Sequence, residues 1–199
     1  MRRWELFLKI GKDIFVNVRR SLLVTATLLA CAASSAPVLA TTVRGTSSAS
    51  AVWISDTQAL PKPIEEVLTN KDRSFIPDLV VIPMGSQVRF PNEDAFYHSI
   101  YSTSPADPFD IGFYDTGPGK VVFFPNPGVI SVHCHIHASM HATIIVADGP
   151  YALVQDGRFE LDDVTPGRHA LHVWSLALGE HVTLVDVPKS GVVTLDENP

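Results

Sequence analysis

The stretch of sequence that decides the fold reads Ile130-Ser131-Val132-His133-Cys134-His135-Ile136-His137-Ala138-Ser139-Met140-His141. Valine and isoleucine crowd its first part, which predicts a β-strand. Alternation along that strand places Val132 and Cys134 on the same face as Ile130, toward a core, and His133 and His135 on the opposite face. A thiolate in a core needs a positively charged partner, so the inward position of Cys134 indicates that its sulfur binds such a partner.

Short strands extend on both sides of this stretch. Glycine, proline and asparagine crowd the gaps between them, and no amphipathic helix of useful length follows residue 41. The expected strands are 52–54, 79–83, 87–90, 121–124, 130–134 and 143–146, with longer loops at 61–63 and 102–109. The pattern predicts an all-β protein whose first domain, residues 52–147, is a β-sandwich large enough for one core.

Asp148-Gly149-Pro150 marks the end of that domain. Strands resume at 151–154, 158–161, 169–174, 181–187 and 192–195, and Asp156-Gly157 is a strong hairpin signal. About 50 residues is a marginal size for an independent domain. We therefore expect residues 148–199 to form a small β-sandwich-like module packed against the first domain. Residues 41–51, rich in serine and threonine, are expected to be a flexible lead-in.

The first 40 residues are typical of a signal peptide. A basic segment precedes Ser21, an uncharged apolar run follows, and Val38-Leu39-Ala40 fits a cleavage site. Three alternatives stay open. Leu28-Leu29-Ala30-Cys31 is similar to a lipoprotein box, Arg19-Arg20 loosely fits a twin-arginine signal, and the apolar run is long enough to remain as a membrane anchor. All four predict a periplasmic or extracellular protein, with membrane attachment only if the N-terminal segment is kept or Cys31 is lipidated.

Charge and cysteine content narrow the possible partners. Of 15 basic and 21 acidic residues, six and two precede Thr41, which leaves nine and 19 and a net charge of −10 with histidine neutral. This argues against nucleic acid and anionic membrane surfaces as partners. Because Cys31 lies in the leader, Cys134 is the one thiol expected after export. A lone thiol in an oxidising compartment is a liability unless something occupies it.

Cys134, His137 and Met140 together have the chemistry of a copper site. An ion that cycles between two oxidation states is held by a thiolate and imidazoles, and a weak axial thioether limits the preference for either state. These three residues come from a single turn at a strand end, so another strong ligand must come from elsewhere. His98 is the candidate, since it follows a strand that ends Val88-Arg89-Phe90-Pro91-Asn92 and a polar turn.

The Val-x-Phe-x-Asn strand end, His98 and the distal Cys-x2-His-x2-Met together resemble the cupredoxin family, most closely its short-loop amicyanin-like and methylamine-utilisation-like members. The resemblance covers roughly residues 51–147 and implies a Greek-key β-sandwich. It implies one type 1 (blue) copper ion held by His98, Cys134, His137 and Met140. It also implies a one-electron carrier rather than an enzyme, with transient redox partner proteins.

In this family the imidazole on the Cys-to-Met loop, here His137, reaches the surface through an apolar rim. Ile136, Ala138 and the loop at 105–109 are the expected rim. Two positions depart from the family pattern. Ser99 stands where an asparagine usually follows the first histidine, and Ala138 stands where a proline often follows the second. Both changes bear on the rigidity of the ligand loops more than on copper binding.

Other functions fit these residues less well. His133-Cys134-His135 resembles part of a multicopper oxidase site, but the chain has too few further histidines for a trinuclear cluster. Zinc prefers closed tetrahedral sets without a thioether, and a nucleophilic Cys134 lacks an evident general base. A copper carrier or storage protein without redox cycling would use the same ligands and stays the alternative. His133, His135 and His141 are expected to lie on the surface or beside the ligands.

The segment 157–173 is similar to carboxypeptidase-regulatory-like and transthyretin-like β-modules, in which a Pro-Gly turn, here Pro166-Gly167, separates two alternating strands. The likeness implies a structural or docking module and carries no chemistry. His169, His172 and His181 in this tail are expected to be solvated.

Overall fold

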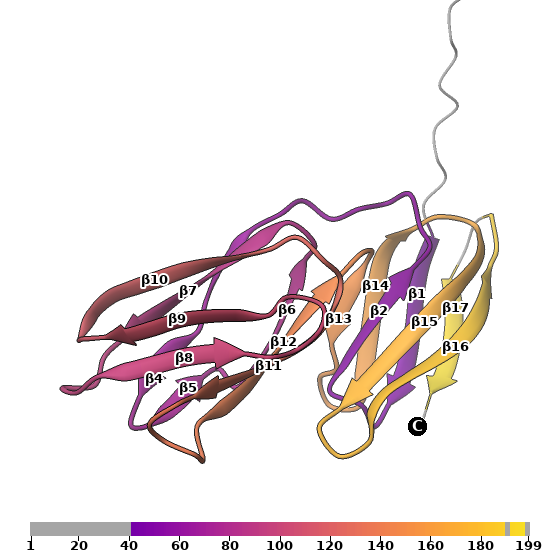
Figure 1. Ribbon diagram of the computed structural model, residues 1–199. Helices are drawn as coiled ribbons and strands as arrows, with labels where there is room; N and C mark the ends of the chain where they lie inside the picture. The colour runs from indigo at the N-terminus through magenta and orange to yellow at the C-terminus, as the bar shows by residue number, and fades with distance from the viewer. Residues whose placement is uncertain (1–40, 190–191, 198–199) are drawn as a thin grey trace, which may run out of the picture. The chain divides into compact units, whose positions relative to one another are not determined.

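The computed structural model of the chain describes residues 41–189 and 192–197. The expected signal peptide, with Cys31, lies outside the described residues. Every regular element of the described part is a β-strand, so the all-β prediction is confirmed (Figure 1). Among the described residues, no helix has the length and apolar character needed to span a membrane.

Two five-stranded sheets form the first sandwich. One has the order β10-β7-β4-β5, with β3 beside β7. Its strands are β3 (Glu65–Val67), β4 (Thr69–Lys71), β5 (Ser74–Ile76), β7 (Ser86–Asn92) and β10 (Gly117–Phe124). The other has the order β6-β12-β11-β8-β9. Its strands are β6 (Leu79–Pro83), β8 (His98–Ser102), β9 (Phe109–Tyr114), β11 (Gly128–Cys134) and β12 (His141–Ala147). Most neighbours are not consecutive in the chain, as Greek-key connections require.

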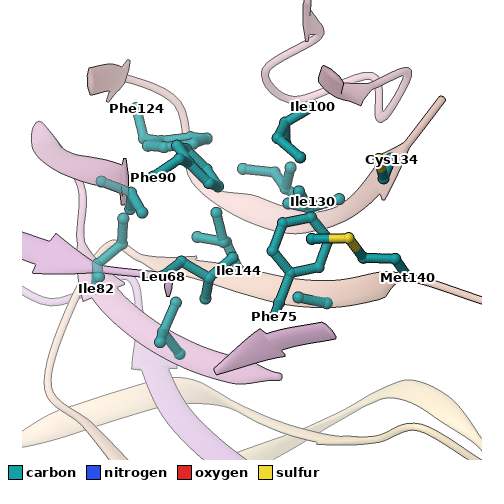
Figure 2. Packing of buried hydrophobic residues seen from close by; sticks show 14 of the residues in the cluster. Leu68, Phe75, Ile82, Phe90, Ile100, Phe124, Ile130, Cys134, Met140 and Ile144 are labelled. Atoms are coloured by element: carbon teal, nitrogen blue, oxygen red, sulfur yellow. The ribbon is translucent and has the colours of Figure 1, made fainter. Parts of the chain in front are cut away.

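The two sheets enclose one apolar core, part of which Figure 2 shows. Ile130, Val132 and Cys134 of β11 are buried in it, as the alternation predicts. Strand β12 is different, because Ile144 contributes to this core and Ile145 to another cluster on its opposite face. Both faces of β12 are therefore covered, which explains why its sequence is a continuous apolar run rather than an alternating one.

Two further sheets form a second sandwich, and their strand orders are β14-β1-β17 and β13-β2-β15-β16. Their strands are β1 (Thr41–Ser47), β2 (Ala51–Ser55), β13 (Tyr151–Leu153), β14 (Arg158–Val164), β15 (Gly167–Ser175), β16 (Gly179–Val187) and β17 (Val192–Glu197). Val43, Val52, Leu161, Leu171 and Val185 belong to the core between them. We refer to this second sandwich as the C-terminal module, although two of its strands precede the first sandwich in the chain.

The expected lead-in at 41–51 is wrong for its first part, because Thr41–Ser47 is the central strand of a sheet. It pairs antiparallel with β14 and parallel with β17. It packs so closely that a Cβ on Gly45 would lie 2.3 Å from the ring of Phe159. Strand β2, which we expected to begin the first sandwich, pairs with β13 and β15 instead. Both partners lie far along the chain, so no local pattern shows the pairing. Strands β1 and β2 contribute Val43 and Val52 to the core of the C-terminal module.

A third buried cluster joins residues of the two sandwiches. Trp53 and Trp174 of the C-terminal module pack with Val81, Ile145 and Ala147 of the first sandwich. Asp148-Gly149-Pro150 lies between β12 and β13. The expected packing of the tail against the first sandwich is therefore present, with large aromatic side chains at the contact.

Candidate metal centre

Three side chains of kinds that can bind a metal ion converge in the first sandwich. Cys134 is the last residue of β11 and is 5% exposed. His98 is the first residue of β8, which pairs with β11. His137 lies in the turn between β11 and β12. Nδ1 of His98 is 3.6 Å from Sγ of Cys134, and Nδ1 of His137 is 3.9 Å from it.

The separation of these atoms fits a single metal ion. Bonds of about 2.3 Å to sulfur and about 2.0–2.1 Å to nitrogen, at angles of about 110–120°, place sulfur and nitrogen about 3.6–3.8 Å apart. The two observed sulfur–nitrogen distances lie at or near that separation, and the three ligand atoms are all within 4.8 Å of one another. A thiolate with two imidazoles is a soft, mixed donor set, which suits copper.

The orientation of the His98 ring is held by a buried carboxylate. His98 is fully buried, and its Nε2 lies 2.9 Å from Oδ2 of Asp94, which is itself 8% exposed. Because a carboxylate only accepts hydrogen bonds, Nε2 carries the proton and donates it. The lone pair is then on Nδ1, which faces Cys134. A carboxylate behind a ligating histidine selects the tautomer and the ring orientation in metal sites. The sequence analysis assigned no role to Asp94.

Asp94 is held in turn by the β4–β5 hairpin. Its Oδ1 accepts from the backbone N–H of Asp72 at 2.7 Å, and its Oδ2 accepts from that of Arg73 at 3.1 Å. Burial pushes the pKa of Asp94 upward, but the hydrogen bonds from Arg73, His98 and Asp72 outweigh burial and hold it below its ordinary value. The carboxylate therefore stays ionised behind His98.

Asn92 and Ser99 arrange the backbone on either side of His98. The Asn92 side chain donates to the carbonyl of Phe96 at 2.8 Å and accepts from the N–H of Asp94 at 3.0 Å, which closes the polar turn before His98. The carbonyl of Ser99 accepts from the N–H of His135 at 2.8 Å. This backbone bond ties β8 to the ligand turn at Ser99. The Ser99 hydroxyl is buried and has no partner among the described residues.

His137 is the ligand candidate closest to solvent. Its ring lies 5.1 Å from that of His98 and 5.4 Å from that of Phe96, centroid to centroid. Burial, followed by the nearby His98 and Arg73, lowers the pKa of His137. A neutral imidazole is the form that binds a metal, so this environment favours the ligating state.

Met140 is 1% exposed and belongs to the core cluster that includes Phe75 and Cys134. Figure 2 shows the Met140 and Cys134 side chains at the same end of that cluster. The turn is closed by two backbone hydrogen bonds, from Cys134 N–H to the Met140 carbonyl at 3.3 Å and from Met140 N–H to the His137 carbonyl at 3.0 Å. These bonds tie the Met140 backbone to the end of β11, while the role of its side chain as an axial ligand stays a prediction.

Exposed apolar residues next to the candidate ligands in the chain make up the candidate rim of the centre. Ile136 is 45% exposed, Ala138 is exposed, and Tyr97 in the turn before His98 is 57% exposed. The expected contribution of residues 105–109 is wrong. Strands β8 and β9 pair from His98–Tyr114 at the centre to Ser102–Phe109 at the other end, so the connecting loop lies at the far end of the strands.

His133 lies on the outer face of its sheet, as the strand alternation predicts. His135 follows the end of β11 and His141 begins β12, and both are exposed, as expected. His133 and His141 stand directly opposite each other on β11 and β12. The His135 ring stacks on Tyr101 with centroids 3.9 Å apart, and its Nε2 is 3.2 Å from a carboxylate oxygen of Asp110. Across residues 41–189 and 192–197, the only group of three or more His, Cys, Asp or Glu residues placed to hold a metal ion is His98, Cys134 and His137.

The histidines of the C-terminal module are less solvated than expected. His181 is exposed, in agreement with the prediction. His169 is 5% exposed, with its Nδ1 3.0 Å from the carbonyl oxygen of Asp56 and its Nε2 2.7 Å from that of Thr165. His172 is half-buried and contacts three side chains of neighbouring strands. The prediction is wrong for these two, because their partners come from other segments of the chain, which the alternation within β15 does not show.

Solved structures similar to parts of this chain include copper proteins. A copper-containing nitrite reductase from Thermus scotoductus SA-01 is 27% identical over 43% of this chain and 23% of its own, with a TM-score of 0.40. A variant of amicyanin in its reduced state is 15% identical over 41% of this chain and 81% of its own, with a TM-score of 0.38. A purple cupredoxin from Nitrosopumilus maritimus is 21% identical over 42% of this chain and 99% of its own, with a TM-score of 0.35.

The chain thus spans less than a quarter of the nitrite reductase that it matches. No protein-family model matches the sequence, and no curated protein matches it significantly. The TM-scores of these structures are low, so the likenesses do not show what the chain does.

Proposed function

We propose that the protein is an exported one-electron carrier that holds one type 1 copper ion through His98, Cys134, His137 and Met140. The observation that carries this proposal is the convergence of two imidazole Nδ1 atoms, at 3.6 and 3.9 Å, on the sulfur of one buried cysteine. A thiolate, two imidazoles and a weak thioether form the ligand set of blue-copper electron-transfer sites. When bound, copper would supply the reversible Cu(II)/Cu(I) couple.

The surrounding residues favour a rigid site, which a fast electron carrier needs. Asp94 holds the His98 ring from behind, and the two backbone bonds close the Cys134–Met140 turn. The Ser99 carbonyl links this turn to β8. Ligands that are fixed by their supporting contacts move little when the charge of the metal changes. The backbone contact of Ser99 therefore supplies part of the rigidity that the family's asparagine would give.

The rim of Tyr97, Ile136 and Ala138 supports transient docking of redox partner proteins. His137 is the more exposed of the two candidate imidazoles, so it is the proposed port for the electron. Partners that must leave quickly use small interfaces. The net charge of −10 outside the leader does not favour nucleic acid as a partner.

The proposed location is the periplasm or the extracellular space, which rests on the leader-like residues 1–40. Membrane attachment enters the proposal only through a retained N-terminal segment or a lipidated Cys31. The C-terminal module is proposed to be a transthyretin-like structural element that buttresses the first sandwich through Trp53 and Trp174.

A copper carrier or storage protein is the alternative. It would use the same donors, but a protein that hands its metal on gains nothing from ligands held by buried contacts. The burial of His98 and its bond to Asp94 therefore favour the electron carrier.

The visible spectrum of the copper-loaded protein tests the proposal. We expect an intense thiolate-to-copper band and a reversible one-electron couple in voltammetry. Cys134→Ser should abolish the band, while the matched control His141→Gln, an exposed histidine next to the turn, should keep it. A colourless protein that binds Cu(I) tightly and has no reversible couple would favour the carrier or storage function. Dioxygen consumption with a reducing substrate would instead indicate an oxidase.

A further inference from the structure

A second group of convergent polar side chains lies in the C-terminal module. Ser55, His172 and Glu180 come from the neighbouring strands β2, β15 and β16 and line a pocket of about 200 Å³. The opposite wall of the pocket includes Gly128 and Asp148. Gly128 is the first residue of β11 and Cys134 is the last, so the pocket is separate from the metal centre.

The three side chains form a continuous relay. Oγ of Ser55 is 2.8 Å from Nε2 of His172, and Nδ1 of His172 is 2.6 Å from Oε1 of Glu180. The direction of both bonds follows from the chemistry of the groups. An ionised glutamate only accepts, so Nδ1 carries the ring proton, and the free lone pair on Nε2 accepts the hydroxyl proton of Ser55. This is the order of nucleophile, base and orienting carboxylate in serine hydrolases.

One further contact fixes the base. The Trp53 ring stacks on the His172 ring, with centroids 4.8 Å apart and an angle of 14° between the planes. The His172 side chain is 17% exposed and that of Glu180 is 36% exposed. The relay is thus partly shielded by Trp53, yet Ser55 and His172 both line the open pocket. A hydroxyl that is in contact with a base and also reachable from solvent meets the first geometric requirement of a nucleophile.

We propose that Ser55 is a nucleophile activated by His172, and that the pocket hydrolyses small carboxylic esters. In the first step Ser55 Oγ bonds to the carbonyl carbon, its proton passes to Nε2 of His172, and the alcohol leaves with that proton. In the second step water adds to the acyl group on Ser55 and gives a proton to His172, and the carboxylic acid leaves as the Ser55 hydroxyl is restored. Glu180 is a positioning residue, because it acts only through His172.

The walls of the pocket define the class of ester. The volume of about 200 Å³ admits a short acyl group with a small alcohol. Asp148 and Glu180 both line it, so neutral or cationic esters are favoured over anionic ones. The proposal is independent of the copper function, since none of these residues contacts the metal centre.

Covalent labelling of the full chain tests the proposal. Diisopropyl fluorophosphate forms a phosphorus–oxygen bond to an activated serine as fluoride leaves and the serine proton passes to the base. We expect mass spectrometry to locate one adduct on Ser55, and we expect Ser55→Ala to abolish it. The matched control Ser131→Ala changes an exposed serine of β11 and should leave the labelling rate unchanged.

Two more variants separate a catalytic relay from a merely structural one. His172→Gln keeps a planar side chain against Trp53 but removes the base, so labelling should slow by about 100-fold or more. Glu180→Gln should slow labelling, and Glu180→Asp should restore part of the rate. Hydrolysis of p-nitrophenyl acetate should follow the same order.

Circular dichroism of each variant shows whether it is folded. If the folded protein is labelled at Ser55 no faster than at Ser131, or if His172→Gln leaves the rate unchanged, the relay is a structural hydrogen-bond network and the proposal is wrong. Labelling is measured with and without copper and should not differ. A failure of the copper proposal therefore leaves this outcome unaffected.

Discussion

Replacing Asp94 by asparagine is the sharpest test of how the metal centre is supported. The Asp94 carboxylate accepts three hydrogen bonds, from Asp72 N–H on Oδ1 and from Arg73 N–H and His98 Nε2–H on Oδ2. Asparagine has nearly the same shape but only one acceptor oxygen. If its NH2 group replaces Oδ1, the N–H of Asp72 loses its acceptor. If the NH2 group replaces Oδ2, both Arg73 and His98 lose theirs.

Either orientation breaks at least one part-buried hydrogen bond and leaves its donor without an acceptor, which costs about 1–3 kcal/mol. We expect Asp94→Asn to lower the free energy of unfolding of the metal-free protein by that amount. Loss of a group that supports a ligating histidine typically costs about 10- to 100-fold in metal affinity. Since tenfold corresponds to about 1.4 kcal/mol, the affinity loss is about 1.4–2.8 kcal/mol.

Urea unfolding of the metal-free protein and competition with a Cu(I) chelator measure the two effects separately. Glu93→Gln is the matched control, because Glu93 is the neighbouring acid and its side chain is half-exposed in a 3.0 Å pair with Lys71. Loss of such a surface pair costs at most about 1 kcal/mol. If Asp94→Asn behaves like Glu93→Gln in both assays, Asp94 does not support the centre and the reasoning is refuted.

Three further predictions concern stability and are checked by denaturant unfolding. Ser99→Ala removes a buried hydroxyl that has no hydrogen-bond partner among the described residues. The unfolding free energy should therefore stay unchanged or rise by up to about 1 kcal/mol. A clear fall in the unfolding free energy would mean that the hydroxyl does have a hydrogen-bond partner. Burial raises the pKa of Tyr114, against the opposing hydrogen bond from Asn70. The protonated Tyr114 hydroxyl therefore contributes stability that is fully present below about pH 10 and is lost as the pH rises through the folded-state pKa. Tyr114→Phe should flatten the fall in the unfolding free energy above about pH 10. Gly45→Ala would place a Cβ 2.3 Å from the Phe159 ring and should cost about 1–3 kcal/mol, whereas wild-type stability would contradict the close packing of β1.

The sequence by itself determined the local features of this protein. The expected strand at 79–83 matches β6, and the inward direction of Cys134 follows from the two-residue period of β11. The spacing of Cys134, His137 and Met140 is set within one turn, so their proximity is a local property as well. Alternation also placed His133 on the outer face correctly, whereas His135 lies one residue beyond the end of β11.

Only the tertiary structure decided the contacts that join distant segments. His98 reaches Cys134 because β8 and β11 are sheet neighbours, and Asp94 supports it because the β4–β5 hairpin holds the carboxylate. The same holds for β1 and β2, which complete a module at the other end of the chain, and for Ser55 beside His172. Periodicity tells which face of a strand is buried, but it does not tell which strand lies beside it. Pairing between segments far apart in the chain depends on the whole core, so these contacts leave no local signal.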